Sequence, residues 1–398
     1  MNIDDSDLDV AQQKSPYSPK SPYSPKSPCS PRKFSLPGSA WNRFRAAGVI
    51  GIFLFAVPLV LLGLLSVSNK QSEFDISNDQ AAVMPAAKCF VRPTYGTDAV
   101  QIFKDIRYGQ AVNPYSGKQT ELLLDLYSPG YDPRPARPAV VLLHGGYLTG
   151  GDKTGDSMPD LAITLAQRGY LVASINYRLA PVSAISFQLL HSHPDRAQHI
   201  VEMVQEDAKA AVRFMRMMAK EWRIDVNRIV IGGDSAGAIA ALYYAYVSGA
   251  PEGNSGNAGY SSAIHSVLAI SGTLRGQAFC GTIDRELRAH NCKIRSPPAP
   301  DVVSQISRGD VPMLLWHGEK DQILPIDNAR ALWERAKAVG VPSFVLAIHN
   351  GGHVPIYEGL DPTKPYLEKW LSFVAGSLNL TEAQCPFSQA GTLEVAAK

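Results

Sequence analysis

A serine flanked by glycines is the residue of this chain best suited to act as a nucleophile. Ser235 stands in the motif GDSAG (residues 233–237), between the apolar run 228–232 and an alanine-rich stretch. This order predicts a strand, a sharp turn and a helix, the local structure that exposes a catalytic serine on a strained turn. In a chain with 32 glycines the motif can also arise by chance. Its interpretation therefore depends on finding partners for Ser235.

A histidine near the C-terminal end is the expected general base. His353 follows an apolar run (343–349) and two glycines that leave its loop free to bring the ring to Ser235. An imidazole there can take the serine proton and activate the nucleophile. His349 is the alternative base, although it stands at the strand end itself, where a histidine is more often structural. The other histidines are interpreted as structural, without metal-ligand spacing: His191, His193, His199, His265, His290 and His317.

The acid that would orient this histidine is expected after the apolar run 312–317. Asp321 in the motif HGEKD (residues 317–321) can accept a hydrogen bond from the histidine Nδ1–H and stabilise the imidazolium. Glu319 and Asp327 are alternative acids close by. Asp234, inside the serine motif, is interpreted as a local structural group.

Backbone amides complete the predicted site. After the apolar run 139–143 comes HGGY (residues 144–147), whose glycines can turn their N–H groups toward a developing oxyanion. The oxyanion hole is therefore predicted from the amides of Gly145, Gly146 and Ala236, the residue after the nucleophile. No metal and no organic cofactor is expected for this chemistry.

Eight apolar runs alternate with helical patterns and must position these residues. The expected strands are 101–108, 121–127, 139–143, 170–177, 228–232, 265–271, 312–317 and 343–349. The expected helices are 157–168, 197–222, 236–247, 327–339 and 366–375. Short buried strands between amphipathic helices predict an α/β fold with a mostly parallel sheet covered on both faces. Its active site is expected at the carboxyl ends of the strands.

In the chain order Ser235, Asp321, His353, these residues resemble the α/β-hydrolase superfamily. Within it, the HGG and GDSAG motifs resemble hormone-sensitive-lipase-like carboxylesterases, as do SINYRLAP (174–181) and WRIDVNRI (222–229). The acid motif is more similar to that of acetyl and feruloyl esterases. HGGY also resembles kynurenine formamidases, and membrane-anchored isoprenylcysteine methylesterases have a similar plan. The resemblance implies a serine carboxylesterase acting on a small-molecule ester, with a formamidase, a methylesterase or an inert binding protein of this fold as alternatives.

The composition is that of a globular protein with an added N-terminal segment. The 398 residues are 45% hydrophobic and carry a formal net charge of +2, which gives no indication of a nucleic-acid partner. We expect a disordered Ser-Pro-rich tail (1–45), a membrane segment (46–67), a linker (68–97), a catalytic domain (98–380) and a C-terminal extension (381–398). The tail repeats SPYSPK, a spacing that suits proline-directed kinases, although a basic tail that only sets membrane orientation is an equal alternative.

Residues 46–67 are predicted to cross a membrane. They carry no charge, and about 20 apolar residues can span a hydrocarbon core of roughly 30 Å. The positive-inside rule places the basic tail in the cytoplasm and the catalytic domain in a lumen or outside the cell. A cleaved signal peptide is the alternative, but this one would be unusually long.

The cysteines and one sequon fit that orientation. Four cysteines follow the predicted membrane segment, an even number that suits an oxidising compartment. Of the three possible connectivities we favour Cys280 with Cys292 and Cys89 with Cys385, with four free buried thiols as the alternative. Asn379 begins the glycosylation motif NLT.

Overall fold

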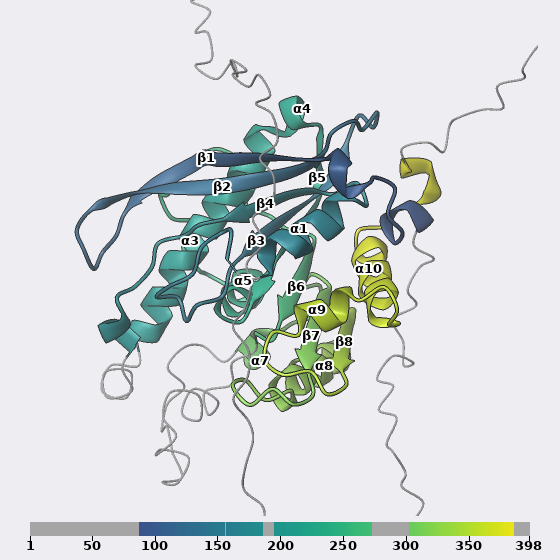
Figure 1. Cartoon of the computed structure of the whole chain (residues 1–398). Coiled ribbons are helices and arrows are strands. Elements are labelled where there is room, and N and C mark those ends of the chain that lie inside the picture. Colours follow the sequence, from purple (N-terminus) through teal and green to yellow (C-terminus); the bar gives the residue numbers. More distant parts are fainter. Residues whose placement is uncertain (1–86, 156, 186–194, 273–301, 386–398) are drawn as a thin grey trace, which may run out of the picture. The chain divides into compact units, whose positions relative to one another are not determined.

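One eight-stranded sheet organises the protein (Figure 1). The computed structural model describes residues 87–155, 157–185, 195–272 and 302–385. The sheet order is β1-β2-β4-β3-β5-β6-β7-β8. The strands are β1 (Val100–Val112), β2 (Gln119–Pro129), β3 (Arg137–Leu143), β4 (Leu171–Ile175), β5 (Ile224–Asp234), β6 (Ser266–Ile270), β7 (Met313–Gly318) and β8 (Ser343–Ile348). Each coincides with one of the eight strands expected from the sequence.

The strand directions bring the predicted site to one edge of the sheet. β1 pairs antiparallel with β2, and β2 pairs antiparallel with β4. All pairings from β4 through β3, β5, β6 and β7 to β8 are parallel. The carboxyl ends of β3, β5, β6, β7 and β8 therefore lie along the same edge, where ligands bind in open α/β sheets.

Helices cover both faces of this sheet. They are α1 (Met158–Ala166), α3 (Asp195–Met217), α4 (Ala219–Trp222), α5 (Ala236–Tyr246), α7 (Val302–Gln305), α8 (Asp327–Val339), α9 (Ile356–Leu360) and α10 (Tyr366–Ser377). Successive side chains of a strand point to opposite faces. In β3, Val141 and Leu143 accordingly pack with α3, α5 and α8, whereas Val140 and Leu142 pack with α1, α9 and α10. The sheet thus lies between two apolar cores.

Two helical regions differ from the expectation. The helix predicted over residues 197–222 is divided into α3 and α4, with a break at Met218. The short helices α7 and α9 were not predicted, because four or five residues are too few to give a helical period. α9 matters for the site, since it begins three residues after His353.

The two ends of the described chain are joined. A disulfide links Cys89 and Cys385, the pairing favoured from the sequence. Short 3-10 turns flank it: η2 (Lys88–Phe90) and η6 (Glu382–Gln384). Phe90 is fully buried in the core beside α1 and α10, so part of the segment that we assigned to the linker packs on the sheet. Further 3-10 turns are η3 (Thr97–Ala99) and η4 (Val182–Ile185).

Several predicted features lie outside the described residues. These are the tail, the membrane segment 46–67, and both Cys280 and Cys292. Within the ranges that are described, no helix is long and apolar enough to cross a membrane. Asn379, the predicted glycosylation site, is exposed just after α10.

Candidate active site

Ser235 occupies the sharp turn that its glycines predicted. It lies between β5 and α5 with φ 48° and ψ −114°, a strained backbone conformation for a residue with a side chain. A Cβ atom at Gly233 or Gly237 would overlap the carbonyl oxygen of Leu143 at the end of β3. Only glycine therefore lets the turn approach β3 this closely. Ser235 is half-buried at the carboxyl edge of the sheet.

The structure brings Ser235, His353 and Asp321 into one hydrogen-bonded line. His353 Nδ1 lies 2.8 Å from Asp321 Oδ2, and His353 Nε2 lies 2.9 Å from Ser235 Oγ. Because the carboxylate can only accept, Nδ1 carries the hydrogen and Nε2 is left to accept from the serine hydroxyl. This is the geometry in which a histidine can remove the serine proton.

The carboxyl group of Asp321 is buried and fully hydrogen-bonded. Its Oδ1 accepts from the amides of Ile323 and Leu324, and its Oδ2 lies near the rings of His317 and His353. Burial alone would raise the pKa of Asp321. The hydrogen bonds from the two histidines and the Leu324 amide outweigh burial and hold that pKa well below its ordinary value. Asp321 therefore stays ionised beside His353.

The alternative acids and base form contacts of their own. Glu319 Oε2 lies 3.1 Å from His349 Nδ1, and this histidine side chain is 64% exposed. Asp327 lies 2.9 Å from Arg330 within α8. Neither carboxylate contacts His353, so the geometry favours Asp321 and His353 over these alternatives.

The loop after β3 lies directly against Ser235. A Cβ atom at Gly145 would be 3.3 Å from Ser235 Cβ, and Gly146 has φ 109°, which favours glycine. Ala236 is the first residue of α5, and the first amides of a helix have no acceptor within it. The three amides predicted for the oxyanion hole thus belong to segments beside Ser235.

Comparisons with known proteins agree with this architecture. The BD-FAE family model matches residues 124–274. Esterase LipC of Mycobacterium tuberculosis is 25% identical over 240 residues, which are 56% of this chain and 54% of LipC. A probable isoprenylcysteine alpha-carbonyl methylesterase of Arabidopsis thaliana, ICMEL1, is 26% identical over 262 residues, 61% of this chain and 50% of that protein.

The family model, these relatives and the fold together support an α/β-hydrolase carboxylesterase family for this chain. Solved structures with the same fold include a truncated carbohydrate esterase from gut microbiota, with a TM-score of 0.53, 19% identity and coverage of 72% of this chain and 98% of that one. Another is the native esterase Est2 of Thermogutta terrifontis, with a TM-score of 0.51, 20% identity and coverage of 76% and 98%. The chain spans about half the length of the curated relatives it matches.

The motif SINYRLAP (174–181) contacts the start of the loop after β3. The Tyr177 hydroxyl donates to the carbonyl oxygen of His144 at 2.7 Å, and the two rings stack with centroids 4.3 Å apart. His144 directly precedes Gly145. The tyrosine therefore fixes the start of the loop that faces Ser235.

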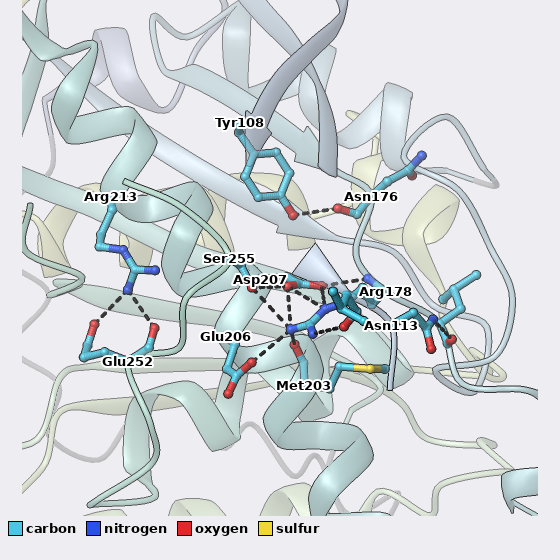
Figure 2. Close-up of polar contacts among 12 residues, drawn as sticks. Tyr108, Asn113, Asn176, Arg178, Met203, Glu206, Asp207, Arg213, Glu252 and Ser255 are labelled. Atoms are coloured by element: carbon cyan, nitrogen blue, oxygen red, sulfur yellow. Dashed lines mark hydrogen bonds and ion pairs between the residues drawn. The ribbon is translucent and has the colours of Figure 1, made fainter. Parts of the chain in front are cut away.

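Arg178 of the same motif anchors the loop after β4 to α3 (Figure 2). Its guanidinium contacts both oxygens of the buried Asp207 at 3.0 Å and also reaches Glu206 and Ser255. Asp207 Oδ1 accepts a further bond from the Ser255 hydroxyl at 2.6 Å. Removing one partner of a buried charge pair strongly destabilises the folded protein, because the other charge is left buried without compensation. We interpret this cluster as structural support.

Sequence reasoning missed two residues near the triad. Ser271, directly after β6, accepts a hydrogen bond at 3.1 Å from the amide of Val354, the residue after His353. His317 was interpreted as structural, yet it contacts Asp321. His317 stands near the end of β7, four residues before Asp321. This spacing was a signal in the sequence that could have indicated the contact. No cluster of three or more potential metal ligands occurs in the described part of the chain.

Proposed function

We propose that this protein hydrolyses carboxylic esters, with Ser235 as nucleophile, His353 as general base and acid, and Asp321 as the group that orients His353. The observation that carries the proposal is the line of hydrogen bonds from Asp321 through His353 to the half-buried Ser235. The family of the chain supports the same reaction.

In the first half of the proposed reaction, Ser235 Oγ attacks the acyl carbon while its proton passes to His353 Nε2. The carbonyl oxygen becomes an oxyanion, which the amides of Gly145, Gly146 and Ala236 would stabilise. When this intermediate collapses, the imidazolium gives its proton to the departing alkoxide. The alcohol leaves and the acyl group stays on Ser235.

In the second half of the proposed reaction, water hydrolyses the acyl group from Ser235 with the help of the same residues. His353 removes a proton from a water molecule, whose oxygen attacks the acyl carbon. A second oxyanion collapses, and the proton returns from His353 to Ser235 Oγ. A carboxylic acid is released, and no co-reactant besides water is consumed.

A series of p-nitrophenyl esters from acetate to palmitate tests the activity and the size of the acyl pocket. We expect hydrolysis by the wild-type protein and none above background by S235A. A wild-type protein that is folded but inactive on the whole series would count against an esterase.

A methyl ester of a prenylated cysteine is a second candidate substrate. The match to ICMEL1, whose name records an isoprenylcysteine methylesterase activity, favours it. Including such a methyl ester and an N-formyl aromatic amide in the series separates this activity and a formamidase from a general carboxylesterase.

We also propose that residues 46–67 anchor the protein and place the catalytic domain on the lumenal or extracellular side. The charge-free sequence of that segment, the basic tail before it and the Cys89–Cys385 disulfide support this orientation. The exposed Asn379 is then available for glycosylation, and the SPYSPK repeats for a proline-directed kinase in the cytoplasm. Protease protection of sealed microsomes, with glycosidase treatment of the N379Q variant as a control, tests the topology.

A further inference from the structure

A second histidine besides His353 contacts the carboxyl group of Asp321. His317 Nε2 lies 3.1 Å from Asp321 Oδ2 and 2.6 Å from the carbonyl oxygen of Leu324. Both neighbours are acceptors, so Nε2 carries the hydrogen; it bonds the Leu324 carbonyl and also faces the Oδ2 charge of Asp321 across the 3.1 Å contact. His317 is 1% exposed, so water has little access to replace it as the donor.

The two oxygens of Asp321 are held in different ways. Oδ1 accepts from the amides of Ile323 and Leu324, at 2.9 and 2.8 Å, within its own loop. Among the described residues, Oδ2 is contacted by two side chains: His353 Nδ1, hydrogen-bonded at 2.8 Å, and His317 Nε2, at 3.1 Å. The direction in which Oδ2 presents itself to His353 thus depends on His317.

His317 also closes the loop that carries the acid. It stands in β7, while Leu324, whose carbonyl it binds, lies three residues beyond Asp321. The next residue in β7, Gly318, would overlap the carbonyl oxygen of Gly352 if it had a Cβ atom. The acid loop and the His353 loop are therefore in direct contact at this point.

We propose that His317 is a positioning residue for the triad: it holds Asp321 Oδ2 toward His353 and thereby keeps His353 Nε2 aimed at Ser235. This inference rests on the proposed function. It assigns no contact with substrate to His317. Both of its contacts, to Asp321 Oδ2 and to the loop of Asp321, act on the position of that carboxylate, so a double-mutant cycle with Asp321 can test the role.

Three variants of His317 separate positioning from packing. H317L removes the donor and keeps most of the apolar volume. H317Q can place an amide Nε2 near the position of the imidazole Nε2, whereas the amide of H317N is too short to reach Asp321. We expect kcat on a p-nitrophenyl ester to fall by about 10- to 100-fold in H317L and H317N, the worth of one hydrogen bond to a charged group, with KM little changed. H317Q should recover most of the activity.

A double-mutant cycle with D321N decides how His317 acts. The measured quantity is the rate at which a fluorophosphonate labels Ser235. If His317 works through Asp321, H317L lowers this rate far less in the D321N background than in the wild type. An equal loss in both backgrounds, or a loss of thermal stability without a change in kcat, would overturn the inference. If H317L does not fold, H317N takes its place in the cycle.

The wild-type protein separates the two proposals. A wild type that hydrolyses esters and reacts at Ser235, together with a fully active H317L, overturns the role of His317 alone. A folded wild type that does neither overturns the proposed function and this inference with it.

Discussion

Two histidine–carboxylate pairs lie on the same two loops, and of these two pairs one contacts Ser235. Asp321 pairs with His353, which contacts Ser235, whereas Glu319 pairs with the exposed His349. We expect D321N to lower kcat by about 10⁴-fold, because the asparagine amide would favour the wrong histidine tautomer. E319Q is the matched control two residues away, and its kcat should stay within about twofold of the wild type, as is usual for exposed pairs. Comparable losses in both variants on one ester substrate would contradict the assignment of the acid.

Asp321 should also make stability depend on pH. Its pKa is lowered in the folded protein despite burial, by the two histidines and the Leu324 amide. A carboxyl group with a lowered folded pKa stabilises the protein above its unfolded pKa of about 3.9, and this contribution is lost as the pH falls toward the folded pKa. The difference in unfolding free energy between wild type and D321N should therefore shrink from pH 6 to pH 3. Denaturant unfolding at each pH measures it, and a difference that grows in acid would contradict the assignment.

At the scale of elements, the end of β6 holds the His353 loop. The Ser271 hydroxyl accepts from the Val354 amide, and Val354 has φ 54°, an unfavourable conformation for a β-branched residue. Without this bond the loop can relax and move His353 away from Ser235. We expect S271A to lower kcat by about fivefold with little change in KM, since one hydrogen bond contributes about 1 kcal/mol.

The variant V354G provides the second arm of this test. Glycine tolerates positive φ, so S271A should cost less activity in a V354G background if the serine acts by holding a strained residue. Full activity of S271A in the wild-type background would show that Ser271 only packs.

The strands, and the residues that meet as Ser235, His353 and Asp321, could be predicted from sequence because their signals are local. Each strand is a short apolar run, and the polar residues after β5, β7 and β8 follow directly along the chain. Ser271 and Val354 meet across 83 residues, and nothing in either segment indicates the contact. The packing of α9 also depends on a residue far away in the sequence. A Cβ atom at Gly359 in α9 would overlap the ring of Trp316 in β7, so this position requires glycine. Such features come from tertiary packing, which apolar periodicity does not encode.

At the scale of the whole molecule, the disulfide Cys89–Cys385 links segments 296 residues apart. Closing so long a loop restricts the unfolded chain, and loss of a native disulfide typically costs about 2–5 kcal/mol. We expect C89S/C385S to unfold at a lower denaturant concentration and to keep its kcat, because η6 contacts Arg134 just before the start of β3, whereas Ser235, Asp321 and His353 follow the carboxyl ends of strands. Non-reducing peptide mapping of the wild type checks the pairing, and free thiols at both positions would contradict it.

We propose above that Ser235 is a nucleophile activated by His353. The most direct test is mass spectrometry of the full-length protein after reaction with a serine-directed fluorophosphonate. We expect one adduct, located on Ser235, that forms rapidly in the wild type, is absent in S235A and forms orders of magnitude more slowly in H353A. A folded wild-type protein without an adduct at Ser235, or one labelled equally fast in H353A, would contradict it.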